Sequence, residues 1–378
     1  MSAKPQNLIE LGALTTKVGS GSTPRGGSKA YKPSGIPLIR SQNVLSGRMA
    51  LEDVAYIDSE QHDKMNRSKV DRGDVLLNIT GASIGRAALS CLDSANVNQH
   101  VCIIRCNDQL DHEYLMFFLN SSHGQKQINR LQSGGNREGL NFQQIRSFKI
   151  PTPSIDEQRR IAGILSTWEK AINTYDRLIA LKEKQKRGLM QCIFSSLEGK
   201  EVAVSDILEE SRVPSESPDV AKRITVRLNL GGVENRKVTS ESKSATKQFQ
   251  RRAGQFIYGK QNIHKGSFGI IPKELDGFES SQDLPAFDFT GICNSLWFYY
   301  FMSREAFYTG FENLMSGTGS KRLSPQVFLS QKVVLPDTEQ QEHIANILLN
   351  IDGLIKNLTK KRDLLKKQKQ GLMQKLLA

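Results

Sequence analysis

The sequence of 378 residues has no apolar run near the roughly 18 residues that a membrane-spanning helix needs. Its first residues, Met-Ser-Ala-Lys-Pro-Gln-Asn, lack the apolar core of a signal peptide. Cysteine is also scarce: the five residues are odd in number and scattered, and no Cys/His set has the spacing of zinc ligands. We therefore expect a cytoplasmic protein with reduced thiols and no metal site.

The motifs of common catalytic sites are missing as well. No Gly-x-x-x-x-Gly-Lys-[Ser/Thr] phosphate loop is present, because the residues at 317–321 have the wrong spacing. No Asn/Asp-Pro-Pro-aromatic motif for methyl transfer occurs, and the acidic residues at 336–339 are not followed by the x-Lys that a nuclease needs. The six histidines include no metal-binding pair at i, i+4. We expect no catalytic residues and interpret the chain as non-catalytic.

Acidic residues are too few to balance the basic ones. The chain has 52 Lys and Arg against 39 Asp and Glu, a formal net charge of +13. An excess of this size is typical of a polyanion partner, because neutralised phosphates release counterions. Solubility alone is the alternative, and part of the excess falls on expected helix ends, where a solvated face is the common explanation.

One stretch occurs twice. Residues 153–191 align without a gap with residues 336–374, 183 positions later, and roughly 15 of about 39 positions are identical. Both copies contain Gln-x-x-Ile-Ala-x-Ile-Leu and Gln-Lys-x-Gly-Leu-Met-Gln. A period this long excludes a solenoid and indicates that a whole domain plus a helix is used twice.

Each copy of the repeat predicts a long helix. A proline and an acidic first turn precede apolar residues at alternating steps of four and three, from Ile161 to Ile179 and from Ile344 to Leu376. This heptad-like row predicts an antiparallel coiled coil, and about 40 residues make a rod of roughly 60 Å that would hold two domains apart. The alternative is two unrelated amphipathic helices in separate cores.

The segments before the two helices follow one plan. Residues 74–79 and 97–105 predict strands, 111–121 predicts a helix, and 148–153 predicts a final strand. Residues 198–335 repeat this order with weaker identity: 253–264 corresponds to 72–81, and 293–303 corresponds to 111–121. We predict domains at 1–153 and 198–336 and helical spacers at 154–197 and 337–378. The acid-, Ser- and Pro-rich segment 209–219 is either an exposed loop or ordered against its domain.

These residues resemble the DNA-specificity subunits of type I restriction–modification systems. The resemblance covers the whole chain and rests on the two duplicated motifs, the loop–strand–Pro approach to each helix, and the strand–loop segment 73–86. The segment 253–270 departs from this pattern, because it is only a faint counterpart of 72–86.

The resemblance implies an α+β fold in which two target-recognition domains alternate with two long helices, paired as an antiparallel coiled coil with pseudo-two-fold symmetry. It implies that each domain reads half of a bipartite target in double-stranded DNA. It also implies two methyltransferase subunits as partners, with nuclease/translocase subunits beside them, and S-adenosylmethionine bound by the methyltransferase and no cofactor in this subunit.

The candidate DNA-reading residues are polar side chains in turns next to strands. Arg suits guanine O6/N7 and Asn or Gln suits adenine N6/N7, because each pair makes two bonds in one plane. In the first domain the candidates are Thr23, Arg25, Arg40, Ser41, Gln42, Asn43, Thr80, Ser83, Arg86, Asn98, Gln99, His100, Asn136 and Arg137. In the second domain they are Asn235, Arg236, Lys260, Gln261, Asn262, His264, Lys265, Ser267, Lys321 and Arg322. For each residue alone, a turn role or a phosphate contact is the alternative to base reading.

The start of each long helix is the candidate docking surface for a methyltransferase subunit. The residues are Gln158, Ile161, Leu165, Gln341, Ile344 and Leu348. Coiled-coil packing explains the Ile and Leu positions equally well, but it does not explain a duplicated Gln. Under the docking hypothesis, changing Ile161 and Leu165 to Asp abolishes assembly with the partner.

Two other functional classes stay open at this point. One is a stand-alone two-headed DNA-binding or transcription factor, which needs no enzyme partner. The other is a coiled-coil adaptor that binds only protein, and salt-sensitive binding to duplex DNA would eliminate it.

Overall fold

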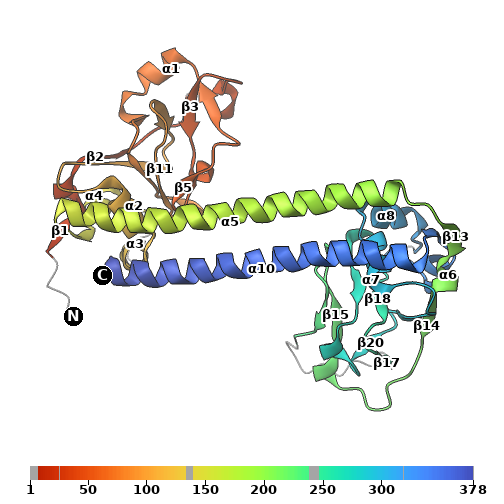
Figure 1. Ribbon diagram of the computed structural model, residues 1–378. Helices are drawn as coiled ribbons and strands as arrows, with labels where there is room; N and C mark the ends of the chain where they lie inside the picture. The colour runs from red at the N-terminus through yellow and green to blue at the C-terminus, as the bar shows by residue number, and fades with distance from the viewer. Residues whose placement is uncertain (1–6, 25, 133–138, 238–246, 318, 378) are drawn as a thin grey trace. The chain divides into compact units, whose positions relative to one another are not determined.

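The structure is a computed structural model that describes residues 7–24, 26–132, 139–237, 247–317 and 319–377. The fold is α+β and divides into two compact units, residues 1–176 with 360–378, and residues 177–359. Each unit combines a globular part with one segment of each long helix, α5 (Ile155–Ser195) and α10 (Thr338–Leu376) (Figure 1). The domain boundaries given above, which separate the helices from the globular parts, stay a prediction.

The first unit is built mainly from strands. These are β1 Leu8–Glu10, β2 Thr15–Ser20, β3 Ile36–Ile39, β4 Val44–Leu45, β5 Arg48–Met49, β6 Ala55–Ile57, β7 Lys69–Val70, β8 Val75–Asn78, β9 Ala87–Leu89, β10 Ala95–Val97, β11 Val101–Cys106 and β12 Lys149–Pro151. The α-helices of this globular part are α1 Ser59–Lys64, α2 His112–Asn120, α3 Ser122–Gln132 and α4 Phe142–Arg146. Two four-stranded sheets, β2-β11-β8-β9 and β6-β3-β10-β7, form its framework.

The second unit repeats part of this framework. Its strands are β13 Lys200–Ala203, β14 Leu208–Ser211, β15 Ile224–Val226, β16 Val233–Asn235, β17 Gln248–Gln250, β18 Phe256–Tyr258, β19 Phe268–Ile270, β20 Glu279–Ser281, β21 Ala286–Phe289 and β22 Lys332–Leu335. Its α-helices besides the two long ones are α6 Val204–Ile207, α7 Ser295–Met302, α8 Glu305–Gly310 and α9 Pro325–Leu329. The sheet β14-β21-β18-β19 has the same order as β2-β11-β8-β9, all strands being antiparallel.

The segment 209–219 is ordered against its domain. Its first residues belong to β14, Pro214 forms a bridge with Phe249, and the Ser215 hydroxyl donates to the buried carboxylate of Glu279 at 2.5 Å. Most of residues 212–219 are exposed, so the segment is an exposed loop that is also ordered against its domain by a buried acceptor.

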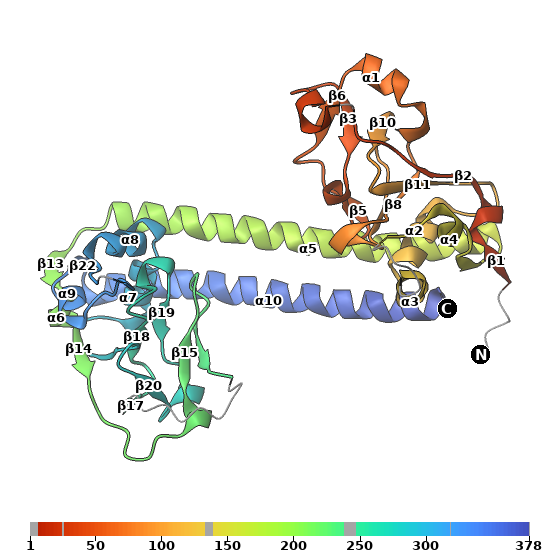
Figure 2. The ribbon, with the colours of Figure 1, turned by 180° about the vertical axis from the view of Figure 1, so that it is seen from behind.

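An apolar helix lies between the sheet and the long helices in each unit. In the first unit, α2 buries Tyr114 to Leu119 in one cluster with Ile161 and Leu165 of α5, Met373 of α10 and Leu377 just after α10. In the second unit, both ribbon views show α7 next to α10 (Figures 1 and 2). There it shares a cluster with Phe194 of α5 and Leu348 of α10.

Within each unit the two long helices run antiparallel, as predicted. In the first unit Arg362 of α10 pairs with Asp176 of α5, whereas Lys369, further along α10, pairs with Glu169, earlier on α5. Arg362 and Lys369 of α10 are therefore partners for the opposite helix. The buried positions near the end of α10 are Met373 and Leu377, one residue after the Leu372 and Leu376 of the predicted row.

None of the described helices is both long and apolar enough to cross a membrane.

Candidate nucleic-acid interface

Backbone hydrogen bonds bring three candidate segments of the first unit together. Strands β3 and β10 are parallel, so both end at the same edge of their sheet. The Asn98 N–H donates to the Ile39 carbonyl at 3.0 Å, and the Asn98 carbonyl accepts from the Gly21 N–H at 3.3 Å. A Cβ at position 21 would clash with the carbonyl oxygen of Val97, so this close approach requires glycine. The turns that hold residues 21–24, 40–43 and 98–100 therefore meet.

Side chains link these turns further. The Thr23 hydroxyl donates to the Gln99 carboxamide oxygen, and Thr80 Oγ1 lies 2.6 Å from His100 Nδ1. Both pairs join residues that are distant in sequence and were proposed as readers from sequence alone. The structure therefore places 23, 80, 99 and 100 in one neighbourhood.

Asn78 connects two more of the candidate turns, and sequence reasoning did not select it. Its buried carboxamide donates to the carbonyls of Ser41 at 2.9 Å and Val44 at 3.1 Å, while its backbone bonds to residues 85 and 86. Asn78 is thus a positioning residue between 41–44 and 80–86. Its place as the last residue of an otherwise apolar strand could have indicated it.

Three candidates of this unit are held by contacts inside the chain. Asp53 accepts from the Gln42 carboxamide at 2.7 Å and lies 3.5 Å from the Arg40 guanidinium. Asn43 is buried and donates to the carbonyls of Ala50 and Asp53. Asn43 therefore shapes its turn, whereas Arg40 and Gln42 reach solvent beside a carboxylate.

Exposure separates the remaining candidates. Thr23, Gln42, Arg86 and Gln99 are exposed; Arg40, Ser41, Thr80, Ser83 and His100 are half-buried; Asn43 and Asn98 are buried. Arg25, Asn136 and Arg137 lie outside the described residues.

In the second unit, the turn from Lys260 to Ser267 is held from within. The Ser267 hydroxyl is buried and donates to the Val226 carbonyl at 3.1 Å, so Ser267 has a structural role. Lys260 is half-buried: desolvation lowers the pKa of its ammonium group, and the neighbouring Asp283 opposes this shift. Gln261, Asn262 and His264 are half-buried, and Lys265, Lys321 and Arg322 are exposed.

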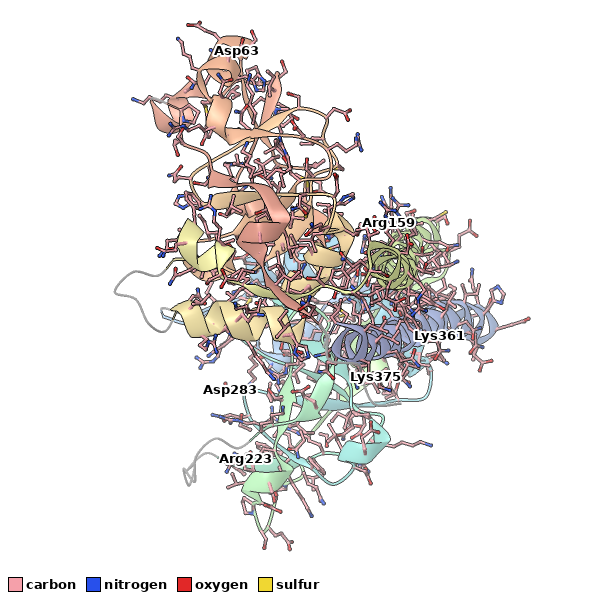
Figure 3. All side chains as sticks on the ribbon, turned by 90° about the vertical axis from the view of Figure 1, so that its left-hand side faces the viewer. Asp63, Arg159, Arg223, Asp283, Lys361 and Lys375 are labelled. Carbon is pink, nitrogen blue, oxygen red and sulfur yellow. The ribbon has the colours of Figure 1, made fainter. Side chains whose placement is uncertain are left out.

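Asn235 and Arg236 lie away from this turn. They stand at the end of the β15–β16 hairpin, where Arg236 N–H donates to the Arg223 carbonyl, whereas the opposite end of the hairpin contacts the turn through Asn229 and Lys265. Figure 3 labels Arg223 and Asp283 on this unit. The ten candidates of the second unit therefore do not form one cluster.

The six candidate docking residues are buried inside the chain. Gln158, Ile161, Leu165, Gln341, Ile344 and Leu348 expose between 0 and 4% of their surface. They pack against the globular part of their own unit, so they offer almost no surface to a partner. We therefore correct the docking hypothesis at these positions and assign them an intramolecular role. Changing Ile161 and Leu165 to Asp tests folding, not docking.

The duplicated glutamines make equivalent hydrogen bonds. Gln158 Oε1 accepts from the N–H of Asp111 at 2.9 Å, and its Nε2 donates to the carbonyls of Gln109 at 3.0 Å and Pro153 at 2.9 Å. Asp111 caps the start of α2. The glutamine therefore ties the start of a long helix to the cap of the apolar helix.

Gln341 repeats this arrangement 183 residues later. It accepts from the N–H of Asn294 at 2.7 Å and donates to the carbonyls of Ile292 at 3.4 Å and Pro336 at 2.9 Å. Asn294 caps α7. A tether inside each unit explains why this residue type is duplicated.

Gln158→Leu is expected to destabilise the first unit by about 2–5 kcal/mol, because it leaves several buried backbone groups without partners. Thermal unfolding measures the loss of stability, and hydrogen exchange locates it. The backbone amides of α2 should lose protection, while those of α7 should keep it. Gln340→Leu, an exposed change one residue from the equivalent glutamine, is the control. Equal stability of Gln158→Leu and the wild type would contradict the tether.

A second duplicated feature joins the long helices to the globular parts. In the first unit the Lys369 ammonium group pairs with Glu169 and lies 5.2 Å from the ring centroid of Phe117. In the second unit Lys186 pairs with Asp352 at 2.6 Å and lies 5.0 Å from the ring centroid of Tyr300.

These two sets correspond at the same offset of 183 residues. We call each set a lysine clamp. Sequence reasoning missed the clamps, although each lysine lies in a duplicated motif, because their acidic and aromatic partners differ between the copies.

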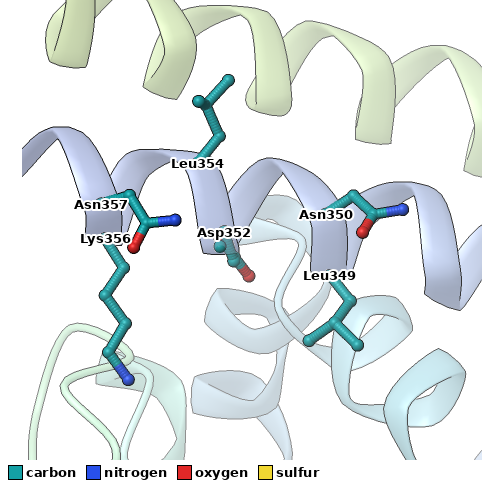
Figure 4. Close-up of a pocket in the computed structure, with 7 residues that line it drawn as sticks. Leu349, Asn350, Asp352, Leu354, Lys356 and Asn357 are labelled. Carbon is teal, nitrogen blue, oxygen red and sulfur yellow. The ribbon is translucent and has the colours of Figure 1, made fainter.

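A cavity of about 720 Å³ lies against α10, and all of its lining residues belong to that helix, among them Leu349, Asp352 and Lys356 (Figure 4). Within the described ranges, no three His, Cys, Asp or Glu side chains come together as a metal-binding group. The cavity has walls from only one element, which does not enclose a small molecule.

Known proteins of one family are similar to this chain over most of its length. A family described as the type I restriction modification DNA specificity domain matches residues 8–183 and 205–367. The MjaX type I restriction enzyme specificity subunit of Methanocaldococcus jannaschii is 23% identical over 388 residues, which covers 91% of this chain and 86% of that protein. The MjaVIII specificity subunit of the same organism is 27% identical over 267 residues, 61% of each chain.

Solved structures show the same fold. The S subunit of a type I restriction-modification system from M. genitalium superimposes with a TM-score of 0.64 at 14% identity, covering 100% of this chain and 98% of that one. A chain from a structure of the type I R-M system, described in terms of complex assembly and conformational transition, gives a TM-score of 0.58 at 16% identity, covering 100% and 99%.

Proposed function

The chain belongs to the type I restriction–modification DNA specificity family, and we propose that it reads a bipartite target in duplex DNA and directs methyltransferase subunits to it. The observation that carries this proposal is the internal repeat of the framework. Both units build the sheet order β2-β11-β8-β9 or its counterpart, tied to the long helices by equivalent glutamines, while the turns at the sheet edge differ. A shared frame with different turns suits two half-sites of different sequence.

The charge and the exposed turns support DNA as the ligand. A net charge of +13 attracts phosphates, and such contacts position a protein on the duplex without selecting a sequence. Exposed arginine and amide side chains such as Arg86, Gln99 and Arg322 can then reach base edges in the major groove. The buried candidates, Asn43, Asn98 and Ser267, shape the turns instead.

We place the docking surfaces for the methyltransferase on exposed positions that the repeat duplicates. Leu181 is 61% exposed and its equivalent Leu364 is 55% exposed. Four and seven residues further along the same helix face lie a glutamine and a glycine in both copies, with Gly188 and Gly371 as the glycines. A Cβ at either glycine would meet no described atom within 4 Å.

Internal packing explains some other duplicated residues of this motif, among them the clamp lysines and the buried Met190 and Met373. It does not explain a repeated exposed leucine and a repeated helix glycine, which costs about 1 kcal/mol relative to alanine. Two equivalent faces fit two copies of one partner, and this number of methyltransferase subunits is part of the proposal.

Leu181→Glu together with Leu364→Glu is expected to reduce co-purification of the methyltransferase at least tenfold, with no change in melting temperature, because both side chains are exposed. Leu349→Glu is the control: it is also an exposed leucine of a long helix, but its equivalent in the first copy is Ser166. Assembly of the double variant at the wild-type level would reject these faces.

The remaining roles are assigned by the same proposal. The chain acts without catalytic residues of its own, and S-adenosylmethionine binds to the methyltransferase. Nuclease/translocase subunits join the assembly where cleavage occurs. None of the comparisons favours a stand-alone transcription factor.

The experiment that tests the proposal is co-expression with a methyltransferase subunit, followed by genome-wide mapping of methylated adenines. A bipartite motif with a fixed gap is the expected result. Footprinting of the assembled complex should show two separate protected blocks, and one continuous block would contradict two-part reading. Binding that weakens steeply with salt eliminates a purely protein-binding adaptor.

A further inference from the structure

Each unit contains an equivalent arrangement of backbone hydrogen bonds where two strands and a loop meet. In the first unit Ile79 follows β8; its N–H donates to the His100 carbonyl at 3.0 Å, and its carbonyl accepts from the Leu140 N–H at 2.9 Å. In the second unit Lys260 stands two residues after β18. Its N–H donates to the Asp283 carbonyl at 3.0 Å, and its carbonyl accepts from the Leu323 N–H at 2.9 Å.

The strand registers agree with this correspondence. Val101 faces Asn78 in the first unit, so Ile79 and His100 are the next pair along the two strands. In the second unit Ile257 faces Ala286, and continuing that register brings Lys260 opposite Asp283. We call this arrangement the reading corner. In the first unit it consists of Ile79, Thr80, His100, Gly139 and Leu140, and in the second unit of Lys260, Asp283, Arg322 and Leu323.

The side chains at the two corners are different in kind. In the first unit Ile79 is buried, Thr80 and His100 contact each other, and Gly139 has no side chain. In the second unit the residue equivalent to Gly139, 183 positions later, is Arg322. Its Nε lies 3.4 Å from Asp283 Oδ1.

The Arg322–Asp283 pair contributes little to the stability of the fold, and its carboxylate is unfavourable for binding DNA. The side chains of Arg322 and Asp283 are 46% and 50% exposed, and a pair this exposed stabilises a fold by about 0–1 kcal/mol. A carboxylate on a DNA-binding edge repels phosphates. A role in orienting the Arg322 guanidinium would explain why the Asp283 carboxylate is there. An arginine that makes two hydrogen bonds to a guanine edge must hold its planar guanidinium in one fixed direction.

We propose that the reading corner sets the base preference of each unit: Arg322 contacts a guanine edge in the second half-site with Asp283 as its positioning residue, and the Thr80–His100 pair occupies the equivalent place for the first half-site. This inference rests on the proposed function. It adds Asp283, which was not among the candidate readers, and it separates Arg322 and His100 from the candidates that contact phosphate or shape turns.

The test uses the complete chain assembled with a methyltransferase and maps the methylated motif for each variant. Arg322→Gln and Arg322→Lys should both lower the preference for guanine at one position of one half-site by about 5- to 150-fold. Arg322→Lys keeps the charge but not the fork, so it separates a guanine contact from a phosphate contact. Asp283→Asn should relax the same position, and His100→Ala should change only the other half-site.

The matched control is Arg252→Gln. Arg252 precedes β18 and pairs at 2.9 Å with Asp288 of β21, at the end of these two strands opposite the corner. The substitution removes the same charge as Arg322→Gln. It should lower overall occupancy without changing any base preference. Melting temperatures of all variants should stay within a few degrees of the wild type.

Two results would overturn the inference. If Arg322→Lys keeps the wild-type preference at every position, Arg322 is only a phosphate contact. If Asp283→Asn keeps it while Arg322→Gln loses it, Asp283 does not position the guanidinium. A wild-type complex that methylates no bipartite motif would instead reject the proposed function, before any variant is compared.

Discussion

A chain that ends at Thr359 is expected to lose the fold of its first unit and to keep that of its second. The missing segment 360–378 belongs to the first unit and supplies Met373 and Leu377 to its core, the latter with no exposed surface. Each such side chain removed costs about 2–5 kcal/mol, and a domain has only about 5–15 kcal/mol in total. Loss of both, with the clamp at Lys369, therefore removes most or all of the stability of the unit.

Hydrogen exchange resolved by segment measures this effect. Amides of α2 should exchange rapidly in the truncated chain, while those of α7 stay protected, because the core around α7 uses residues before Thr359. Lys361→Ala with Lys375→Ala, two basic side chains of the removed segment (Figure 3), is the control and should leave α2 protected. Protection of α2 in the truncated chain would show that the first unit folds without the end of α10.

Reversing the charge of one lysine clamp is expected to have the second-largest effect. The side chains of Lys369 and Glu169 are only 16% and 24% exposed, so Lys369→Glu places two carboxylates together with little water to screen them. A partly buried like-charge pair and the lost contact with Phe117 should cost about 3–5 kcal/mol. Unfolding by denaturant measures the change in the first unit.

The exchange of both charges distinguishes a clamp from a general charge effect. Glu169→Lys combined with Lys369→Glu should recover part of the loss, but not the contact between the cation and the ring of Phe117. Lys367→Glu changes the same charge at an exposed position of the same helix and should cost less than about 0.5 kcal/mol. A double exchange no more stable than Lys369→Glu alone would mean that the pair does not act as a unit.

The frame of the molecule could be predicted from the sequence because it is local or duplicated. Helix signals at 111–121, the strand at 74–79 and the long helices all correspond to observed elements, with ends that differ by a few residues. Their apolar periodicity depends on neighbours in sequence, and the repeat at 183 residues required the two copies to fold alike. The antiparallel pairing followed because two copies of one apolar row bury best against each other.

The role of the duplicated Gln158 could not be predicted in this way. The sequence shows that the glutamine is duplicated, but a surface for a partner and a tether inside each unit both predict such a duplication. Burial decides between them, and burial depends on α2, whose cap at Asp111 is 47 residues away in the chain. The six positions predicted for docking are therefore buried inside the chain.

The sequence alone determined that one frame of strands, apolar helix and long helix is used twice and that the chain carries a basic excess for a polyanion, because periodicity, repetition and charge are properties of the chain itself. Only the tertiary structure decided which polar residues surround each reading corner. Lys260, Asp283 and Arg322 come from three separate segments, and backbone hydrogen bonds between these segments bring them to one place. A contact between residues so far apart is fixed by the whole fold, so no local pattern could reveal it.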